Sequence, residues 1–236
     1  MIDQTFLKGA AAAVGLTLSA AQCAQLDSYA ELLVQRNQTI NLTAITEPAE
    51  IAVKHFADSL SLLAALPFPA GAHVVDVGSG AGFPGLPLCI ARSDLSVTLL
   101  DSLNKRVDFM NEVIALLGLP AHALALRAEQ ASRDPAHRER YDIAVSRAVA
   151  ALPSLCEYCL PLVRPGGFFL AQKGGDIQEE LAAATDAISL LGGAVHQVTP
   201  LTLSDGSART VVTIKKLRQT PPTYPRNPAK IKKSPL

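Results

Sequence analysis

The residues that could carry chemistry are concentrated in one stretch, residues 73–85. The stretch begins with an apolar run broken only by Asp76, which indicates a parallel strand buried on both faces. The glycines that follow let the backbone turn sharply and approach a ligand, because glycine has no Cβ. Pro84 then suits the first turn of a helix. A strand, a glycine turn and a helix in this order predict a nucleotide pocket at the carboxyl end of an open α/β sheet.

The glycine spacing fits two classes of cofactor. Gly80, Gly82 and Gly85 match the G-x-G-x-x-G pattern of dinucleotide-binding proteins, which is a weak signal by itself. Asp76 with Gly78 and the next two glycines matches the acidic-x-G-x-G-x-G pattern of proteins that bind S-adenosylmethionine (AdoMet). A carboxylate at the strand end suits the sulfonium and α-ammonium of AdoMet, through direct or water-bridged bonds. A dinucleotide has no comparable need, so the turn favours AdoMet over NAD.

A second carboxylate ends the next predicted strand, residues 96–101. Asp101 is placed there to hold a ribose hydroxyl pair, which both cofactors have. Strand and helix patterns then alternate over residues 105–117, 121–126, 141–145, 152–162, 166–174 and 177–191.

The chain closes with two apolar segments, residues 194–203 and 208–216. They flank Ser204-Asp205-Gly206-Ser207, which is a hairpin signal. A parallel α/β series that ends in an antiparallel pair is the architecture of AdoMet-dependent methyltransferases, whereas dinucleotide-binding folds usually continue with parallel strands. We therefore predict a Rossmann-like α/β methyltransferase fold with a mostly parallel seven-stranded sheet ending in an antiparallel hairpin.

Helical patterns precede this sheet. Ser19 and Gln22 form a capping box, and Pro48 opens a helix that carries His55 and Asp58. That helix either exposes one face to solvent or forms a lid over the cofactor. We expect three parts: a helical cap over residues 1–70, an AdoMet-binding core over 71–218, and a basic, proline-rich tail over 219–236.

The composition excludes several classes of protein. Hydrophobic residues make up 49% of the chain and charged residues 18%, which is typical of an ordinary globule and not of disorder. No apolar run approaches the length of a membrane span. The start superficially resembles a signal peptide, but Asp3 and Gly15 argue against that and favour a cytosolic helix pair. We expect the protein to be cytoplasmic and monomeric.

The cysteines and histidines predict no metal site. The four cysteines lie in predicted helices and suggest a reducing compartment. Cys156 and Cys159 resemble a redox or metal pair, but they fall within an apolar helical pattern without a second pair, so we interpret them as core packing. The five histidines are scattered, without metal-ligand spacing.

The methyl acceptor is constrained by what the sequence lacks. Enzymes that methylate adenine amines usually carry Asn/Asp-Pro-Pro-aromatic after the fourth strand, where this chain has Ser146-Arg147-Ala148-Val149. Pyrimidine carbons need a cysteine nucleophile, typically in a Pro-Cys dipeptide that is absent here. Guanine N7 fits, because its bare lone pair needs no general base. Arg147 and Lys173, at adjacent strand ends, could grip the N7 and O6 edge, or hold a phosphate or the methionine carboxylate.

A further set of motifs matches one family in order and spacing. These motifs are Asn41-Leu42-Thr43-Ala44-Ile45, His55-Phe56-Ala57-Asp58-Ser59-Leu60, Asp76 through Leu88, Leu100-Asp101-Ser102, Lys105-Arg106, Arg127-Ala128-Glu129, Ser146-Arg147-Ala148, Lys173-Gly174 and Tyr224-Pro225-Arg226. The chain resembles the GidB/RsmG family, bacterial methyltransferases of small-subunit ribosomal RNA. The tail departs from the pattern at Asn227-Pro228-Ala229.

The resemblance implies an activity and a set of contacts. The activity is AdoMet-dependent N7 methylation of one guanine in a loop of the small-subunit RNA near the decoding site. Gly78, Phe83, Arg147 and the backbone around Ala128 and Glu129 would contact AdoMet, with Asp101 as a further candidate. Phe83 would pack on the cofactor, and Glu129 could accept from the adenine amine.

The charge distribution fits an RNA partner. Eight of the 21 basic residues and none of the 21 acidic ones lie in residues 209–236, so that segment carries +8 and the rest −8. A proline-broken basic tail cannot form one helix but can lie along the phosphates of ribosomal RNA or a ribosomal particle. The alternative is a solvated tail without a role.

Two other activities stay open at this point. The acidic body is compatible with an AdoMet enzyme that acts on a small molecule or a protein. The Gly80-x-Gly82-x-x-Gly85 spacing is compatible with an NAD-dependent oxidoreductase. An RNA-binding protein without enzymatic activity is disfavoured, because no residue of the AdoMet-binding pattern is missing from the glycine turn.

Overall fold

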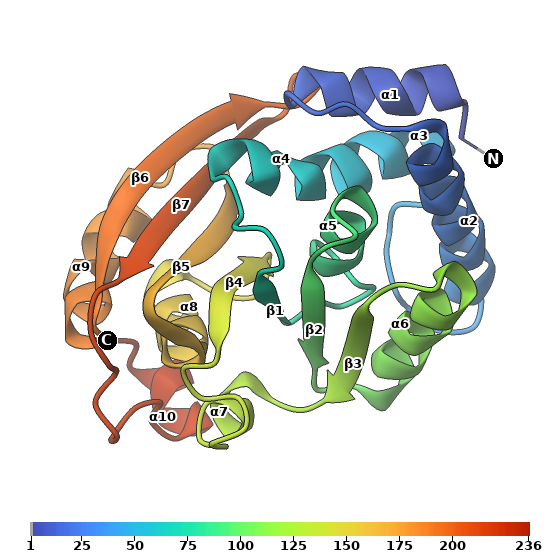
Figure 1. The fold of residues 1–236 in the computed structure, drawn as a ribbon. Coiled ribbons are helices and arrows are strands. Elements are labelled where there is room, and N and C mark those ends of the chain that lie inside the picture. Colours follow the sequence, from blue (N-terminus) through green and yellow to red (C-terminus); the bar gives the residue numbers. More distant parts are fainter. Residues whose placement is uncertain (1) are drawn as a thin grey trace.

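The segments predicted as strands form one seven-stranded sheet in the computed structural model, which describes residues 2–236 (Figure 1). The order across the sheet is β3-β2-β1-β4-β5-β7-β6. The first five strands are parallel, and β7 is antiparallel to both β5 and β6. The predicted fold class is therefore confirmed. The strands are β1 (His73–Val77), β2 (Ser96–Asp101), β3 (Ala121–Ala125), β4 (Tyr141–Arg147), β5 (Val163–Gly174), β6 (Gly193–Thr202) and β7 (Ala208–Lys216).

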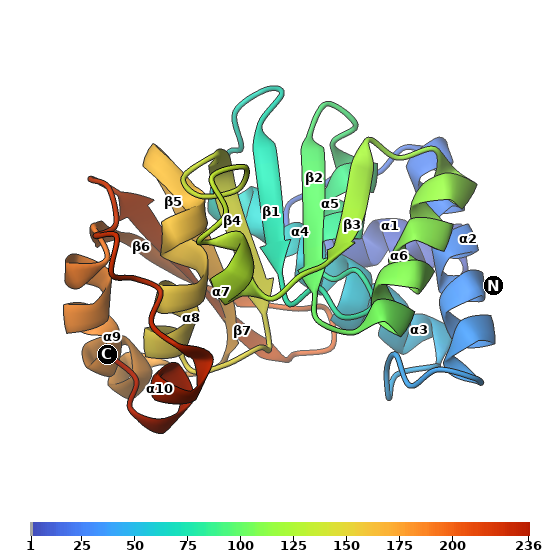
Figure 2. The same ribbon diagram turned by 90° about the horizontal axis from the view of Figure 1, so that it is seen from below.

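The helices cover both faces of this sheet. Figure 2 shows α8 and α9 in front of the strands, and α1, α4 and α5 behind them. The helices are α1 (Gln4–Ala13), α2 (Ala20–Asn37), α3 (Pro48–Glu50), α4 (Asp58–Ala65), α5 (Gly85–Ala91), α6 (Asn104–Leu117), α7 (Ala128–Ala131), α8 (Leu152–Cys159), α9 (Gln178–Leu190) and α10 (Pro228–Lys233), with a π-helix η1 (Ile51–Ala57) and a 3-10 turn η2 (Leu160–Leu162).

Each face of the sheet has its own hydrophobic core. On one face, Val97 and Leu99 of β2 share a cluster with Leu26 of α2 and Phe56 of η1. On the other, residues of α8 and α9 pack on β1, β4, β5 and β7. The N-terminal helices thus contribute directly to the core of the sheet, and the division at residue 70 stays a prediction.

The structure tests several local predictions made from the sequence. The Ser19–Gln22 capping box is present, with both reciprocal hydrogen bonds. Cys156 and Cys159 are fully buried, and burial raises the pKa of both thiols, which confirms core packing. The expected helix 152–162 is wrong at its end, because η2 follows Cys159. Within residues 2–236, no helix is both long and apolar enough to cross a membrane.

The strand order places the site. After β3 the chain returns to the other side of β1, so β1 and β4 are neighbours although β4 comes later in the sequence. Ligands of open α/β sheets bind outside the carboxyl ends of the strands at this kind of switch point. Gly78, Asp101 and Arg147 end or follow β1, β2 and β4, so all three lie at that edge.

Candidate active site

A cleft of about 720 Å³ lies at this edge of the sheet. Its walls include Gly78 after β1, Asp101 at the end of β2, and Ala128 and Glu129 of α7. These are four of the residues that the sequence assigned to the cofactor. Pockets for small molecules and cofactors range from about 300 to 1,000 Å³, so the cleft is large enough for AdoMet.

Gly78 cannot be replaced by a larger residue without moving this wall. Its φ is +74°, and a Cβ there would come within 2.5 Å of a methyl group of Val149. The amides of Gly78 and Ser79 both donate to the carbonyl of Leu100, at 2.8 and 3.1 Å. The turn after β1 is therefore fixed to β2, and the loop after β4 closes directly over it.

Two carboxylates face the cleft with acceptor capacity to spare. Asp101 accepts the amides of Gly80 and Leu103 at 3.0 and 2.9 Å and pairs with Arg106 at 3.4 Å, yet a carboxylate offers about four lone-pair sites. Glu129 accepts no hydrogen bond from the residues that the structure describes (2–236), although it is buried. Acceptors of this kind suit the ribose hydroxyls and the adenine amine of AdoMet, so the residues present fit this cofactor.

Asp76 lies behind the turn and does not line the cleft. Its side chain is fully buried, and Oδ2 accepts the amide of Gly85 at 2.8 Å. Oδ1 has no hydrogen-bond partner within residues 2–236, and burial raises the pKa of the carboxyl to about 7. Asp76 therefore holds the first turn of α5. Gly80 has a φ of +60°, and its backbone amide donates a hydrogen bond to Asp101.

Phe83 also lies outside the cleft. Its ring stacks on His55 at a centroid distance of 4.4 Å and on Tyr29 at 5.4 Å. Tyr29 in turn donates to the carbonyl of Ala81 in the glycine turn. The ring that was expected to pack on the cofactor thus packs on protein side chains from α2 and η1.

Arg147 is the centre of a buried cluster beside this stack. Its guanidinium lies 5.0 Å from the Phe83 ring centroid and donates to Asp58 Oδ2 at 3.1 Å. Asp58 also accepts Arg209 Nε at 3.1 Å and Gln172 Nε2 at 2.9 Å through Oδ1. Arg147 is therefore no surface charge. Only 14% of its side chain is exposed, and burial lowers its pKa.

The helix around His55 and Asp58 is not solvated on that face. Both residues are buried, and burial together with the neighbouring Arg147 lowers the pKa of His55 to about 3. The interpretation as a plain solvated face is wrong. His55 is a neutral hydrogen-bonding group, with Nε2 at 2.9 Å from the hydroxyl of Thr43.

Lys173 does not join Arg147. Arg147 pairs in register with Gln172, and successive side chains of a strand point to opposite faces, so Lys173 faces away from Arg147. Lys173 Nζ donates to Glu180 at 2.6 Å and to the carbonyl of Ala150 at 2.7 Å. In this arrangement Arg147 and Lys173 do not face one guanine edge together, as the sequence had led us to expect. Lys173 instead secures the loop that lines the cleft.

Sequence reasoning missed three members of the Arg147 cluster. Gln172 had no assigned role, Arg209 was counted only among the basic residues of segment 209–236, and Asp58 was noted only on its helix and in a family motif. The one available signal is that Gln172 and Arg209 lie on β5 and β7 at the edge where Arg147 ends β4.

Comparison with known proteins identifies the family. The model of the GidB family, described as rRNA small subunit methyltransferase G, matches residues 22–209. The chain belongs to the GidB family. A relative named ribosomal RNA small subunit methyltransferase G from Desulforamulus reducens is 48% identical over 98% of this chain and 97% of its own length. Another of the same name from Alkaliphilus metalliredigens is 43% identical, with both chains covered completely.

More distant solved structures share the fold. A 16S rRNA (adenine(1408)-N(1))-methyltransferase variant from Catenulisporales acidiphilia, solved with SAM as cosubstrate, has a TM-score of 0.53 at 16% identity over 64% of this chain and 88% of its own. TrmN from Thermus thermophilus has a TM-score of 0.53 at 20% identity, over 67% of this chain and 48% of its own. Membership of the GidB family makes this chain an AdoMet-dependent methyltransferase.

Proposed function

We propose that this protein transfers the methyl group of AdoMet to N7 of a guanine in small-subunit ribosomal RNA. The observation that carries the proposal is the pairing, in a member of the GidB family, of a cleft lined by Gly78, Asp101 and Glu129 with the adjoining Arg147 cluster. The cleft suits adenosine, and the arginines suit the electronegative N7 and O6 edge of guanine.

Methyl transfer to guanine N7 requires the protein mainly to align the reacting atoms. Bound AdoMet supplies a methyl group on a positively charged sulfur. Guanine N7 attacks with a lone pair and loses no proton, so no general base is required. The task of the chain is to hold nucleophile, methyl carbon and sulfur in line and to exclude water.

Each predicted site residue has a part in this proposal. Gly78 lets the backbone come close to AdoMet, while Asp101 and Glu129 accept from its adenosine, with Ala128 beside them. Phe83 and Arg147 lie next to one another, and we assign them to the methionine end of AdoMet or to the guanine edge. Asp76, Gly80 and Lys173 position the turn and the loop around the cleft.

The working form that we infer is a cytoplasmic monomer acting on ribosomal RNA or on the small ribosomal particle.

The proposal is tested by incubating the purified protein with methyl-labelled AdoMet and one of three acceptors: naked small-subunit RNA, the assembled small subunit, or a total protein and metabolite extract without RNA. We expect label in the RNA of one or both of the first two, and cleavage at the labelled nucleotide after borohydride and aniline, which attack 7-methylguanine. Label only in the extract would favour a small-molecule or protein substrate. Binding of NAD without AdoMet would favour an oxidoreductase.

A further inference from the structure

The C-terminal segment is bound to the body of the protein. Arg226 forms a bidentate ion pair with Glu157 of α8, with Nη2 at 2.7 Å from Oε2 and Nε at 3.0 Å from Oε1. The backbone amide of Arg226 donates to the same carboxylate at 2.6 Å. Glu157 is fully buried, so this pair fixes one point of the tail firmly, because an uncompensated charge at a buried site is costly.

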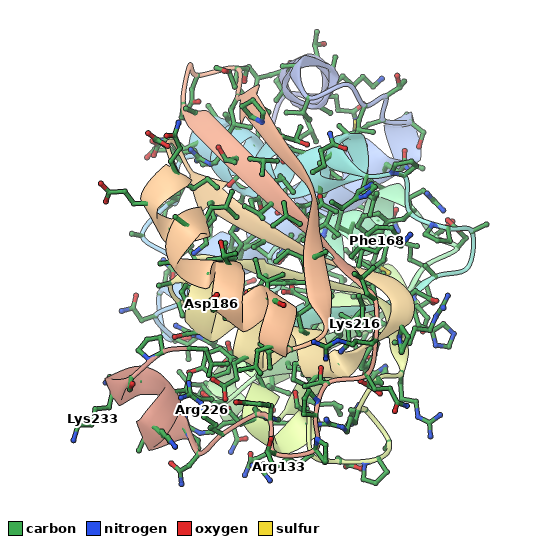
Figure 3. The ribbon with its side chains drawn as sticks, turned by 90° about the vertical axis from the view of Figure 1, so that its left-hand side faces the viewer. Arg133, Phe168, Asp186, Lys216, Arg226 and Lys233 are labelled. Carbon is green, nitrogen blue, oxygen red and sulfur yellow. The ribbon has the colours of Figure 1, made fainter. Side chains whose placement is uncertain are left out.

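Further contacts secure the chain on either side of Arg226. The guanidinium of Arg138 donates to the carbonyls of Thr220 and Tyr224, both at 2.9 Å. Ile231 of α10 is fully buried. Figure 3 shows Arg226 within the lower part of the molecule, with Lys233 projecting outward. The short helix α10 is therefore anchored by an ion pair before it and an apolar contact within it.

This anchored segment forms part of the cleft. Pro228, Lys232 and Pro235 line it together with Gly78, Asp101 and Glu129. Ser154 and Tyr158 of α8 line it too, and Tyr158 directly follows Glu157. The helix that carries the anchoring carboxylate thus also carries a wall of the cleft.

We propose that residues 226–235, here called the C-terminal wall, complete the AdoMet site, and that Arg226 and Glu157 are positioning residues for it. The GidB family model matches residues 22–209, so the wall lies outside the matched segment. The inference rests on the proposed function only in taking AdoMet as the ligand of the cleft. If the wall forms part of the site, its docking and AdoMet binding stabilise each other reciprocally.

The first test measures AdoMet affinity by calorimetry in the full-length protein without RNA. Arg226→Gln removes the ion pair and should raise the AdoMet Kd by about tenfold or more, within the usual range of coupling between linked equilibria. The double variant Arg226→Gln with Glu157→Gln leaves no orphaned carboxylate and should show the same loss. Ile231→Ser loosens the wall independently. The matched control is Arg164→Gln, which breaks the exposed pair with Asp142 and should leave the Kd unchanged.

The second readout is tryptic cleavage of the wall, which contains Lys230, Lys232 and Lys233. AdoMet should slow cleavage there by about tenfold in the wild type, and this protection should be lost in Arg226→Gln. Unchanged AdoMet affinity in all three folded variants, or no protection of the wild-type wall by AdoMet, overturns the inference while leaving the proposed function intact. Failure of the wild type to bind AdoMet overturns both.

Discussion

Arg147, at the end of β4, and Asp58, at the start of α4, form a buried ion pair at 3.1 Å although 89 residues separate them in the chain. The pair joins the sheet to the N-terminal helices at the edge where the cleft lies. Because Arg209 shares the same carboxylate, one buried Asp58 offsets two guanidinium groups. The position of Arg147 relative to the cleft therefore depends on a residue far outside the glycine turn.

Replacing Asp58 should destabilise the protein strongly. Asp58→Asn leaves two guanidinium groups without their counter-charge, and removing one partner of a buried pair costs about 3 kcal/mol or more. Urea unfolding followed by circular dichroism measures the loss. The control is Asp94→Asn, whose pair with Arg92 is 42% exposed on the aspartate side, so its loss should destabilise the protein far less. Equal effects of the two substitutions would contradict a central role for Asp58.

Arg147→Lys should abolish most activity while the fold persists. Lysine keeps the positive charge near Asp58 but lacks the planar fork that binds two acceptors at once. We expect methyl transfer to fall on the order of 100-fold, as a misplaced reacting group does. Arg164→Lys, at a half-exposed site, serves as control. Measuring AdoMet affinity in parallel separates two roles: a matching loss assigns Arg147 to the cofactor, and an unchanged affinity assigns it to guanine. Full activity would show that it does neither.

Glu129→Ala should weaken AdoMet binding. The carboxylate has no hydrogen-bond donor within residues 2–236 and lines the cleft, so it is available to the adenine amine. Hydrogen bonds to charged groups contribute roughly 1.5–3 kcal/mol, which corresponds to a rise in Kd of about 10- to 100-fold. Glu112→Ala, which breaks the surface pair with Arg36, should leave the Kd as it is. An unchanged AdoMet Kd in Glu129→Ala would show that Glu129 does not contact the cofactor.

His55 should make stability fall in mild acid. Its folded pKa of about 3 lies below the model-peptide value of 6.5, so the unfolded chain binds a proton in this interval that the native protein does not. The contribution of His55 is therefore fully present above pH 6.5 and is lost as the pH falls toward 3. Between pH 6 and 4, His55→Gln should reduce the slope of unfolding free energy against pH by up to about 1.4 kcal/mol per unit. Identical slopes in urea titrations would contradict a neutral buried His55.

Much of the fold and part of the cleft follow from local sequence. Gly78 and Asp101 come directly after apolar strands, and the carboxyl ends of parallel strands meet at one edge, so the chain order alone brings them together. The Arg147 cluster could not be found this way, because its members come from α4, β4, β5 and β7 and meet only through tertiary packing.

The errors also have physical causes. Lys173 was paired with Arg147 because both are basic and lie at adjacent strand ends, but the register pairs Arg147 with Gln172 and so turns Lys173 to the opposite face. The basic segment 209–236 was interpreted by charge alone. Three of its cations make contacts inside the protein, since Arg209 pairs with Asp58, Arg226 pairs with Glu157, and Lys216 is fully buried.

The central claim is that the methyl group goes to guanine N7, and one substrate comparison tests it most directly. Small-subunit RNA is transcribed with guanosine or with 7-deazaguanosine, which has carbon in place of N7, and each is incubated with the protein and labelled AdoMet, assembled into particles if naked RNA is inactive. The account predicts label in the guanosine RNA and none in the 7-deazaguanosine RNA. Equal labelling of both RNAs would contradict it.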